Sequence, residues 1–405
     1  MSDAAVWVRA WGAATPWGGW GATVPRLDAG DTAIREIERF DARAYPCSRA
    51  ASCAHDLWAE DPRRALSLAA LRDAGERGDD GWRAEAERAR VGIFWGAESG
   101  LARFWCAFAF ADAMGRDGAY DPARLAAHPE RLGDALAESR TSPATPARAL
   151  ASSLRARGPV STISYACASG AVAVAEGARA IAQGRCQLAI CGGVGADVDP
   201  LLLSAFGRLG VLSARGVCAP FDQRRDGFAL GEGAALVVLS AERGAARVQL
   251  AGSGRSLDAA SLTAPLTDGA GAARAIDAAL RGLDADQVRH VEAHGTGTEL
   301  NDRAEALALH RALGQGARAV SVSAVKGALG HWIAGAGALG VVAAVTALER
   351  ARGFPIAGLD ELDAECDLPG AGRASAWSAA PGDLALACSF GFGGANAALA
   401  FRRAA

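Results

Sequence analysis

One cysteine of this chain stands where an expected strand turns directly into an expected helix. Residues 161–170 read Ser-Thr-Ile-Ser-Tyr-Ala-Cys-Ala-Ser-Gly, so a β-branched run ends at Cys167 and small residues follow. Such a turn exposes the side chain at its tip, and the helix N-terminus supplies N–H groups that favour a thiolate and an oxyanion. Cys167 is therefore a candidate nucleophile, although most cysteines are ordinary buried packing residues.

A second segment, residues 291–305, carries His294 from an expected strand into a glycine-rich turn. The turn reads Gly-Thr-Gly-Thr and offers backbone N–H groups together with the hydroxyls of Thr296 and Thr298. Donors of this kind, beside an imidazole, can stabilise a developing negative charge. A histidine satisfied inside the core is the alternative interpretation.

A third segment, residues 325–331, places Lys326 five residues before a second histidine, His331. Lys326 is the only lysine among 42 basic residues, and the excess of Arg, Ala and Gly is typical of a GC-rich coding bias. A lysine retained against that bias is expected where a planar guanidinium does not serve, because the two cations differ in shape, hydration and pKa. Chance retention of a surface lysine is the alternative.

A fourth segment, residues 388–396, is a glycine-rich loop that leaves Phe390 and Phe392 free to move. A tight turn without function is its alternative interpretation. The chain has only six histidines, and two of them lie in glycine-rich turns, which favours the functional interpretation of these segments.

The elements that must position these segments follow an α/β pattern. Short apolar or β-branched runs predict buried strands, and longer alanine-rich stretches have the length and spacing of helices, the first of which is expected to stop at Gly184. The predicted strands are residues 91–95, 160–165, 187–191, 235–239 and 319–323, and the predicted helices are residues 169–183, 271–282, 302–313 and 336–351.

The composition is that of an enzyme-sized globular chain: 405 residues, 51% hydrophobic, 21% charged and a net charge of −3. Arginines spread along the whole sequence argue against a dedicated nucleic-acid or anionic-membrane surface. We expect no secretory signal and no run long enough to span a bilayer, hence a cytoplasmic protein. Nine cysteines without a C-x-x-C pair predict neither a disulfide framework nor a zinc site.

In this order, the four segments resemble those of the β-ketoacyl-acyl carrier protein synthases, the condensing enzymes of fatty acid and polyketide assembly. Residues 12–18, 191–193 and 220–233 support the resemblance, which covers nearly the whole chain. It implies one body, residues 1–405, with a thiolase-like α/β fold of five αβαβα layers. Two similar halves are expected, about 1–242 with the nucleophile and about 243–405 with the histidines and the lysine.

The resemblance implies a decarboxylative Claisen condensation that needs no metal and no cofactor beyond the phosphopantetheine of an acyl carrier protein. Cys167 would take an acyl group from that carrier, and His294 and His331 would stabilise the enolate formed as malonyl-carrier protein loses carbon dioxide. The enolate would then attack the acyl-cysteine to give β-ketoacyl-carrier protein. Type II polyketide biosynthesis is slightly favoured over fatty acid biosynthesis.

Supporting roles are implied as well. The backbone N–H groups of Cys167 and Phe392 are the expected oxyanion hole, and Lys326 is expected to support the histidines, in part through Glu305. The other residues assigned in this way are the gating residues Gly391 and Gly393 and the pantetheine-binding residues Thr296 and Thr298.

Several positions depart from the family pattern, and they bear on substrate and partner rather than on reaction class. They are Tyr165 and Ala395 in place of a usual threonine, Gly195 and Gly340 in place of frequent acidic residues, a short loop at 213–220 and a long segment at 101–141. In the long segment Phe104, Cys106, Phe108 and Phe110 would share one face if extended. Phe108, Phe110 and Phe206 are candidate acyl-pocket residues, with packing at a dimer interface as the alternative for the strip.

Three other functions are compatible with the same fold. A degradative thiolase would carry a second catalytic cysteine where this chain has Ser389-Phe390-Gly391. A non-catalytic, chain-length-factor-like subunit would lack the nucleophile, and a purely acyl-transferring relative would keep Cys167 and lose a histidine. A dimer is expected, either of two identical chains or with a chain-length-factor-like partner.

Overall fold

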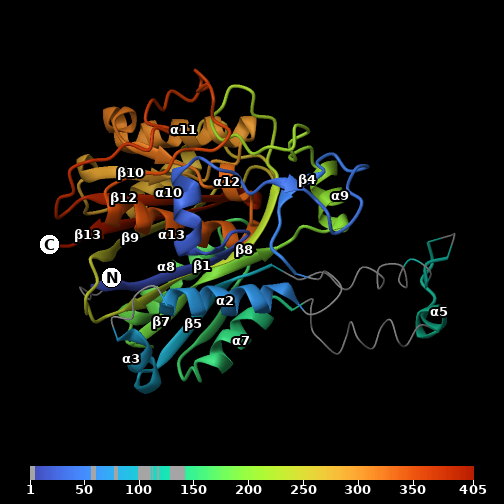
Figure 1. Ribbon diagram of the computed structural model, residues 1–405, viewed down its shortest axis with the longest axis horizontal. Helices are drawn as coiled ribbons and strands as arrows, with labels where there is room; N and C mark the ends of the chain where they lie inside the picture. Colours follow the sequence, from blue (N-terminus) through green and yellow to red (C-terminus); the bar gives the residue numbers. More distant parts are fainter. Residues whose placement is uncertain are drawn as a thin grey trace.

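The computed structural model describes residues 5–55, 61–76, 81–98, 111, 113–115, 118–127 and 142–405. In this part of the chain, helices and strands alternate in five layers (Figure 1). One outer layer contains α2 (Pro62–Glu76), α3 (Trp82–Arg88) and α7 (Thr145–Ser153), the central layer contains α8 (Ser169–Ala182) and α13 (Ala336–Arg350), and the other outer layer contains α10 (Ala270–Ala279) and α11 (Glu299–Leu313).

Between these helices lie two sets of five strands with the same pairing order. The order is β1-β8-β7-β5-β6 in the first set and β9-β13-β12-β10-β11 in the second. In both sets the first two pairings are antiparallel and the last two are parallel. The strands are β1 (Val6–Thr15), β5 (Val91–Gly96), β6 (Val160–Ile163), β7 (Leu188–Ala196), β8 (Leu230–Ser240), β9 (Val248–Leu257), β10 (Val288–Glu292), β11 (Ser321–Ser323), β12 (Leu384–Gly391) and β13 (Ala395–Arg403).

Antiparallel pairing of β1 with β9 joins the two sets into one sheet. The repeated order confirms the expected fold of two similar halves. Smaller elements complete the described chain: β2 (Gly18–Gly19), α1 (Trp20–Asp28), β3 (Arg35–Glu36), β4 (Arg49–Ala51), α5 (Pro122–Ala126), α9 (Pro200–Arg208) and α12 (Lys326–Leu329).

The central helices α8 and α13 pack closely because glycines lie at their contact. A Cβ atom on Gly170 would lie 2.5 Å from the backbone nitrogen of Ala338. The segment Ile333–Arg350, which includes α13, is long and apolar enough to cross a bilayer, and the expectation that no run reaches that length is wrong. It is 89% buried inside the protein, as expected of a core helix that is apolar on all sides.

The predicted strands and helices are confirmed, with shifts at their ends. Gly184 follows α8 with φ +67°, as a helix stop requires. β8 begins at Leu230, five residues earlier than the predicted run. The first residues of this strand include two glycines, which have low strand propensity, so the sequence pattern did not predict them as strand. Those glycines have a packing role: a Cβ on Gly233 would lie 2.4 Å from the indole of Trp332.

Candidate active site

The nucleophile elbow lies between β6 and α8. Ala166, directly before Cys167, has φ +48°, a region that costs a non-glycine residue about 1–3 kcal/mol. The hydroxyl of Ser169 accepts a hydrogen bond from the Tyr165 N–H at 2.7 Å and donates to the Ala166 carbonyl at 2.6 Å. Ser389, from the second half, donates to the Cys167 carbonyl at 3.0 Å. These contacts hold the turn in its strained form.

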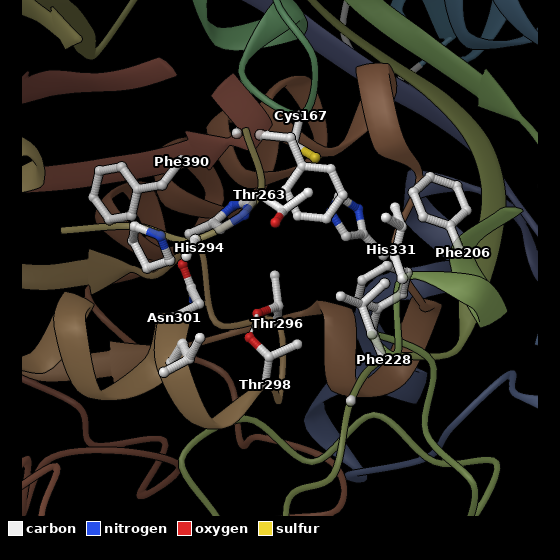
Figure 2. A pocket seen from close by; sticks show the side chains of 18 of the residues that line it. Cys167, Phe206, Phe228, Thr263, His294, Thr296, Thr298, Asn301, His331 and Phe390 are labelled. Atoms are coloured by element: carbon white, nitrogen blue, oxygen red, sulfur yellow. Dashed lines mark hydrogen bonds between the residues drawn. The ribbon is translucent and has the colours of Figure 1, made fainter. Parts of the chain in front are cut away.

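Three reactive side chains meet at this elbow. The Cys167 sulfur and the ring nitrogens of His294 and His331 lie within 4.8 Å of one another, and all three residues are buried. They line a cavity of about 460 Å³ (Figure 2). In this view Thr296 and Thr298 lie across the cavity from Cys167. Cys167, His294 and the two threonines follow the carboxyl ends of β6 and β10, where open α/β sheets place their ligands, and His331 follows α12.

The protonation of His331 follows from its backbone contact. The Ile333 N–H donates to His331 Nδ1 at 3.1 Å, so the neutral ring carries its proton on Nε2. Burial, together with the positive charge of Lys326, holds the pKa of His331 well below its usual value. His331 is therefore a neutral hydrogen-bond donor. A metal ion bound through Nε2 would displace this proton, and the neutral ring would then carry its proton on Nδ1. The Nδ1–H would face the Ile333 N–H, and the hydrogen bond between them would be lost.

His294 is held by its backbone. Its N–H donates to Glu305 Oε1 at 2.6 Å, the Gly295 N–H donates to Glu305 Oε2 at 2.7 Å, and the Lys326 ammonium donates to the His294 carbonyl. Burial, then Lys326 and His331, keep the pKa of His294 well below its usual value. The two imidazole rings lie edge to face with centroids 5.6 Å apart. Lys326 and Glu305, which are both buried, thus hydrogen-bond to the backbone of the same turn, at His294 and Gly295.

Sequence reasoning missed Asp302 as the anchor of the Gly/Thr turn. This buried carboxylate in the first turn of α11 accepts hydrogen bonds from the backbone N–H groups of Thr296, Gly297 and Phe221. An acidic residue in the first turn of the predicted helix was the available signal, because such residues face free N–H groups. Thr296 and Thr298 line the cavity, and their hydroxyls lie 2.9 Å apart.

The glycine loop supplies another wall of the cavity. Gly391 and Phe392 line it, whereas the Gly393 N–H donates to the Leu262 carbonyl and Gly393 does not line it. Phe206, on α9, also lines the cavity, and its ring centroid lies 6.4 Å from that of Phe392. Phe228 packs its ring against His331 at 4.9 Å.

The electrostatics of Cys167 differ from the expectation of a favoured thiolate. Burial raises the pKa of its thiol to about 11, although Lys326 and the Phe392 N–H lower it. Desolvation therefore outweighs the local positive charge in the free protein. The Phe392 and Cys167 N–H groups that act on the sulfur are the pair expected to form the oxyanion hole.

The structure bears on two of the positions that depart from the family pattern. A Cβ on Gly195 would lie 1.9 Å from the Trp332 carbonyl oxygen, so no acidic side chain fits there. Residues 101–110, which include Phe108 and Phe110, lie outside the described residues, and so does the aromatic strip. The eight cysteines in the described ranges are free and buried.

A thiol on a strained elbow, two neutral imidazoles and a thiolase-like fold define a protein of acyl-thioester chemistry. Comparison with known proteins agrees. Residues 32–245 match the β-ketoacyl synthase N-terminal domain model, and residues 248–360 match the C-terminal domain model. The chain belongs to the β-ketoacyl synthase family, which are condensing acyltransferases.

The relatives include a subunit of a polyketide synthase and a 3-oxoacyl-[acyl-carrier-protein] synthase. The chain is 33% identical to the ketoacyl synthase alpha subunit of the tetracenomycin polyketide synthase of Streptomyces glaucescens, over 93% of this chain and 92% of that protein. It is 38% identical to 3-oxoacyl-[acyl-carrier-protein] synthase 2 of Synechocystis sp., over 62% of this chain and 63% of that protein.

Solved structures show the same fold over the whole chain. The ishigamide ketosynthase/chain length factor has a TM-score of 0.82 at 27% identity and covers 99% of both chains. A β-ketoacyl synthase from Burkholderia phymatum has a TM-score of 0.80 at 27% identity and covers 100% of both chains.

Proposed function

We propose that this protein condenses an acyl group held on Cys167 with a malonyl unit held on an acyl carrier protein. The Cys167 sulfur attacks the acyl thioester, and its proton leaves with the phosphopantetheine thiol of the donor carrier. Malonyl-carrier protein then loses carbon dioxide, and the electron pair of the broken C–C bond forms the enolate. The enolate carbon attacks the acyl carbonyl, the cysteine sulfur leaves, and β-ketoacyl-carrier protein results.

The observation that carries this proposal is the meeting of one thiol and two imidazoles within 4.8 Å. Because Ile333 fixes the His331 proton on Nε2, that atom donates a hydrogen bond to an enolate oxygen without first gaining a proton. His294 acts on the same oxygen, and the Cys167 and Phe392 N–H groups act on the acyl carbonyl. No metal or redox cofactor is required for this route.

The remaining residues support binding. Thr296 and Thr298 bind the pantetheine arm, since both line the cavity on the side opposite Cys167, along the path that the arm would take to the thiol. Lys326 and Glu305 hold the His294 turn. Phe206 limits the acyl pocket, and Phe108 and Phe110 are proposed to do so from the long segment.

The partner is proposed to be an acyl carrier protein, and the assembly a dimer of two ketosynthase-fold subunits in the cytoplasm. The second subunit is an identical chain or a chain-length-factor-like subunit, as in relatives solved with such a factor. Similarity to a polyketide synthase alpha subunit over more than nine tenths of both chains favours a type II polyketide pathway. The chain divides near residue 242 into its two halves.

Intact mass of the carrier protein tests the reaction. The protein is incubated with acyl-carrier protein and malonyl-carrier protein, and a product heavier than the acyl carrier by one two-carbon keto unit, with release of carbon dioxide, supports condensation. Transfer of the acyl group without carbon dioxide would instead identify an acyl-transferring relative. An inactive chain that never becomes acylated would identify a non-catalytic subunit.

A further inference from the structure

A carboxylate outside the catalytic cavity contacts the nucleophile elbow. Glu98 lies two residues beyond the end of β5. The Ser164 hydroxyl donates to Glu98 Oε2 at 2.5 Å, and the Ser169 hydroxyl lies 3.2 Å from Glu98 Oε1. These two serines stand three residues before and two residues after Cys167. Glu98 does not line the cavity, and its side chain contacts the elbow rather than the reacting groups.

The elbow needs this support because its backbone is strained at Ala166, whose φ is +48°. Strain of this kind persists only where the surrounding structure holds it in place. Ser169 does so from two sides, by accepting from the Tyr165 N–H and sharing its single proton between the Ala166 carbonyl and Glu98. The carboxylate thereby ties the end of β5 to the turn that presents the thiol.

The strand register explains why position 98 reaches the elbow. In the ladder between β5 and β6 the last paired residue of β5 is Gly96, and in the ladder between β10 and β11 the last paired residue of β10 is Glu292. Glu98 and His294 each lie two residues farther along the chain. The position that supplies a catalytic imidazole in the second half therefore supplies a carboxylate in the first.

We propose that Glu98 is a positioning residue for Cys167: with Ser164 and Ser169 it holds the strained elbow that presents the thiol. Its negative charge also acts on the thiol. The proposal rests on the proposed function only in taking Cys167 as the acylated group. Burial has the largest effect on the Cys167 thiol and raises its pKa. The Lys326 charge lowers this pKa, and the Glu98 carboxylate raises it.

Other titratable and charged groups lie near Cys167 and Glu98 and also affect the pH dependence of the thiol. His294, His331 and Lys326 face the thiol, and burial together with Lys326 keeps both imidazoles neutral. On the other side, Glu98 interacts with the buried carboxyl of Asp197, and the Arg63 guanidinium donates to the Glu98 backbone carbonyl at 2.7 Å. Only Glu98 joins its charge to the elbow by side-chain hydrogen bonds to Ser164 and Ser169.

Two substitutions separate charge from positioning. Glu98→Gln removes the charge and keeps hydrogen-bonding atoms, so the midpoint of Cys167 alkylation by iodoacetamide should fall by about one pH unit, with roughly tenfold faster labelling below it. Glu98→Ala removes both, so kcat for acylation should fall at least about tenfold with KM little changed. Glu176→Gln, on the helix α8 that follows the elbow and paired with Arg179 and Arg255, is the matched control.

Labelling is followed by mass spectrometry of the Cys167 peptide, with circular dichroism to confirm folding. An unchanged alkylation profile in Glu98→Gln, or wild-type acylation by Glu98→Ala, would overturn the proposal. Alkylation requires no carrier protein, so it separates this proposal from the proposed function. A shifted profile in a protein that does not condense substrates would support the role of Glu98 and refute the ketosynthase reaction.

Discussion

The two halves of this molecule share one strand order and carry different chemistry. The first half presents a thiol, Cys167, at the end of its edge strand, and the second presents Lys326 after the matching strand and His294 after the neighbouring one. At the end of the ladder with the edge strand, the last paired residue of the neighbouring strand is Gly96 in the first half and Glu292, with a buried carboxyl, in the second. In the proposed reaction, a repeated scaffold thus lets one half form the covalent bond while the other stabilises charge.

The division of labour reflects what each half can hold. A nucleophile needs a strained turn and a helix N-terminus, and the elbow before α8 supplies both. An imidazole that donates a hydrogen bond while uncharged needs an environment that lowers its pKa. The second half supplies one, because it buries His294 and His331 near the positive charge of Lys326. Substitutions in each half test whether covalent bond formation and charge stabilisation belong to different halves.

The largest effect is expected when the first half loses its nucleophile. Cys167→Ala should lower condensation by about 10³-fold or more, because no covalent acyl-enzyme forms. Intact mass after incubation with acyl-carrier protein measures the acyl-enzyme directly. Cys186→Ala, which removes another buried thiol of this half, is the matched control. Acylation that survives in Cys167→Ala would place the nucleophile elsewhere.

Removing a histidine should separate the two half-reactions. His294→Ala or His331→Ala is expected to slow decarboxylation of malonyl-carrier protein by about 10²- to 10³-fold, because each deletes a donor to the enolate. Acyl transfer onto Cys167 should change far less. Carbon dioxide release and acyl-enzyme mass are measured on the same variant. Equal losses in both assays would show that the second half also serves the covalent step.

Lys326→Arg keeps the positive charge and should still lower condensation by about tenfold or more. The ammonium donates to the His294 carbonyl in a buried site near the carboxyl groups of Glu305 and Glu292, and we expect a planar guanidinium not to fit there. The loss of turnover is compared with the change in free energy of unfolding. Wild-type turnover would show that the lone lysine persists by chance.

The smallest effect concerns Glu292 and appears in stability rather than turnover. Burial raises the pKa of this carboxyl from 4.5 to about 8. The folded protein therefore holds a proton that the unfolded chain releases, so the contribution of Glu292 to stability falls as pH rises from about 4.5 to 8. Glu292→Gln lacks this titration, and its free energy of unfolding relative to the wild type should rise across that window.

Urea unfolding at several pH values measures that difference, with Glu176→Gln, which removes a partly exposed carboxylate, as the control. A difference that stays constant between pH 4.5 and 8 would mean that Glu292 ionises normally. The first half offers no equivalent variant, because Gly96 stands at the matching position and a Cβ there would lie 2.5 Å from the backbone of Gly170.

Local patterns in the sequence were sufficient for the α/β class and for the turns that carry Cys167, His294 and His331. A β-branched run followed by small residues encodes a strand-to-helix turn over about ten residues, and glycines mark many of the backbone positions with positive φ, although Ala166 at the elbow is not one of them. The family resemblance added the two similar halves, which the repeated strand order confirms. All of this information lies within short stretches of chain.

Long-range contacts decided the rest. The proton on His331 depends on the Ile333 N–H, the thiol pKa depends on burial, and the contact of Glu98 with the elbow depends on the pairing of β5 with β6. Pairwise spacing along the chain carries no information on such contacts, since desolvation and hydrogen-bond geometry arise only when distant segments pack. The sequence determined which chemical groups are present, and the tertiary structure decided which of them are neutral, strained or within reach.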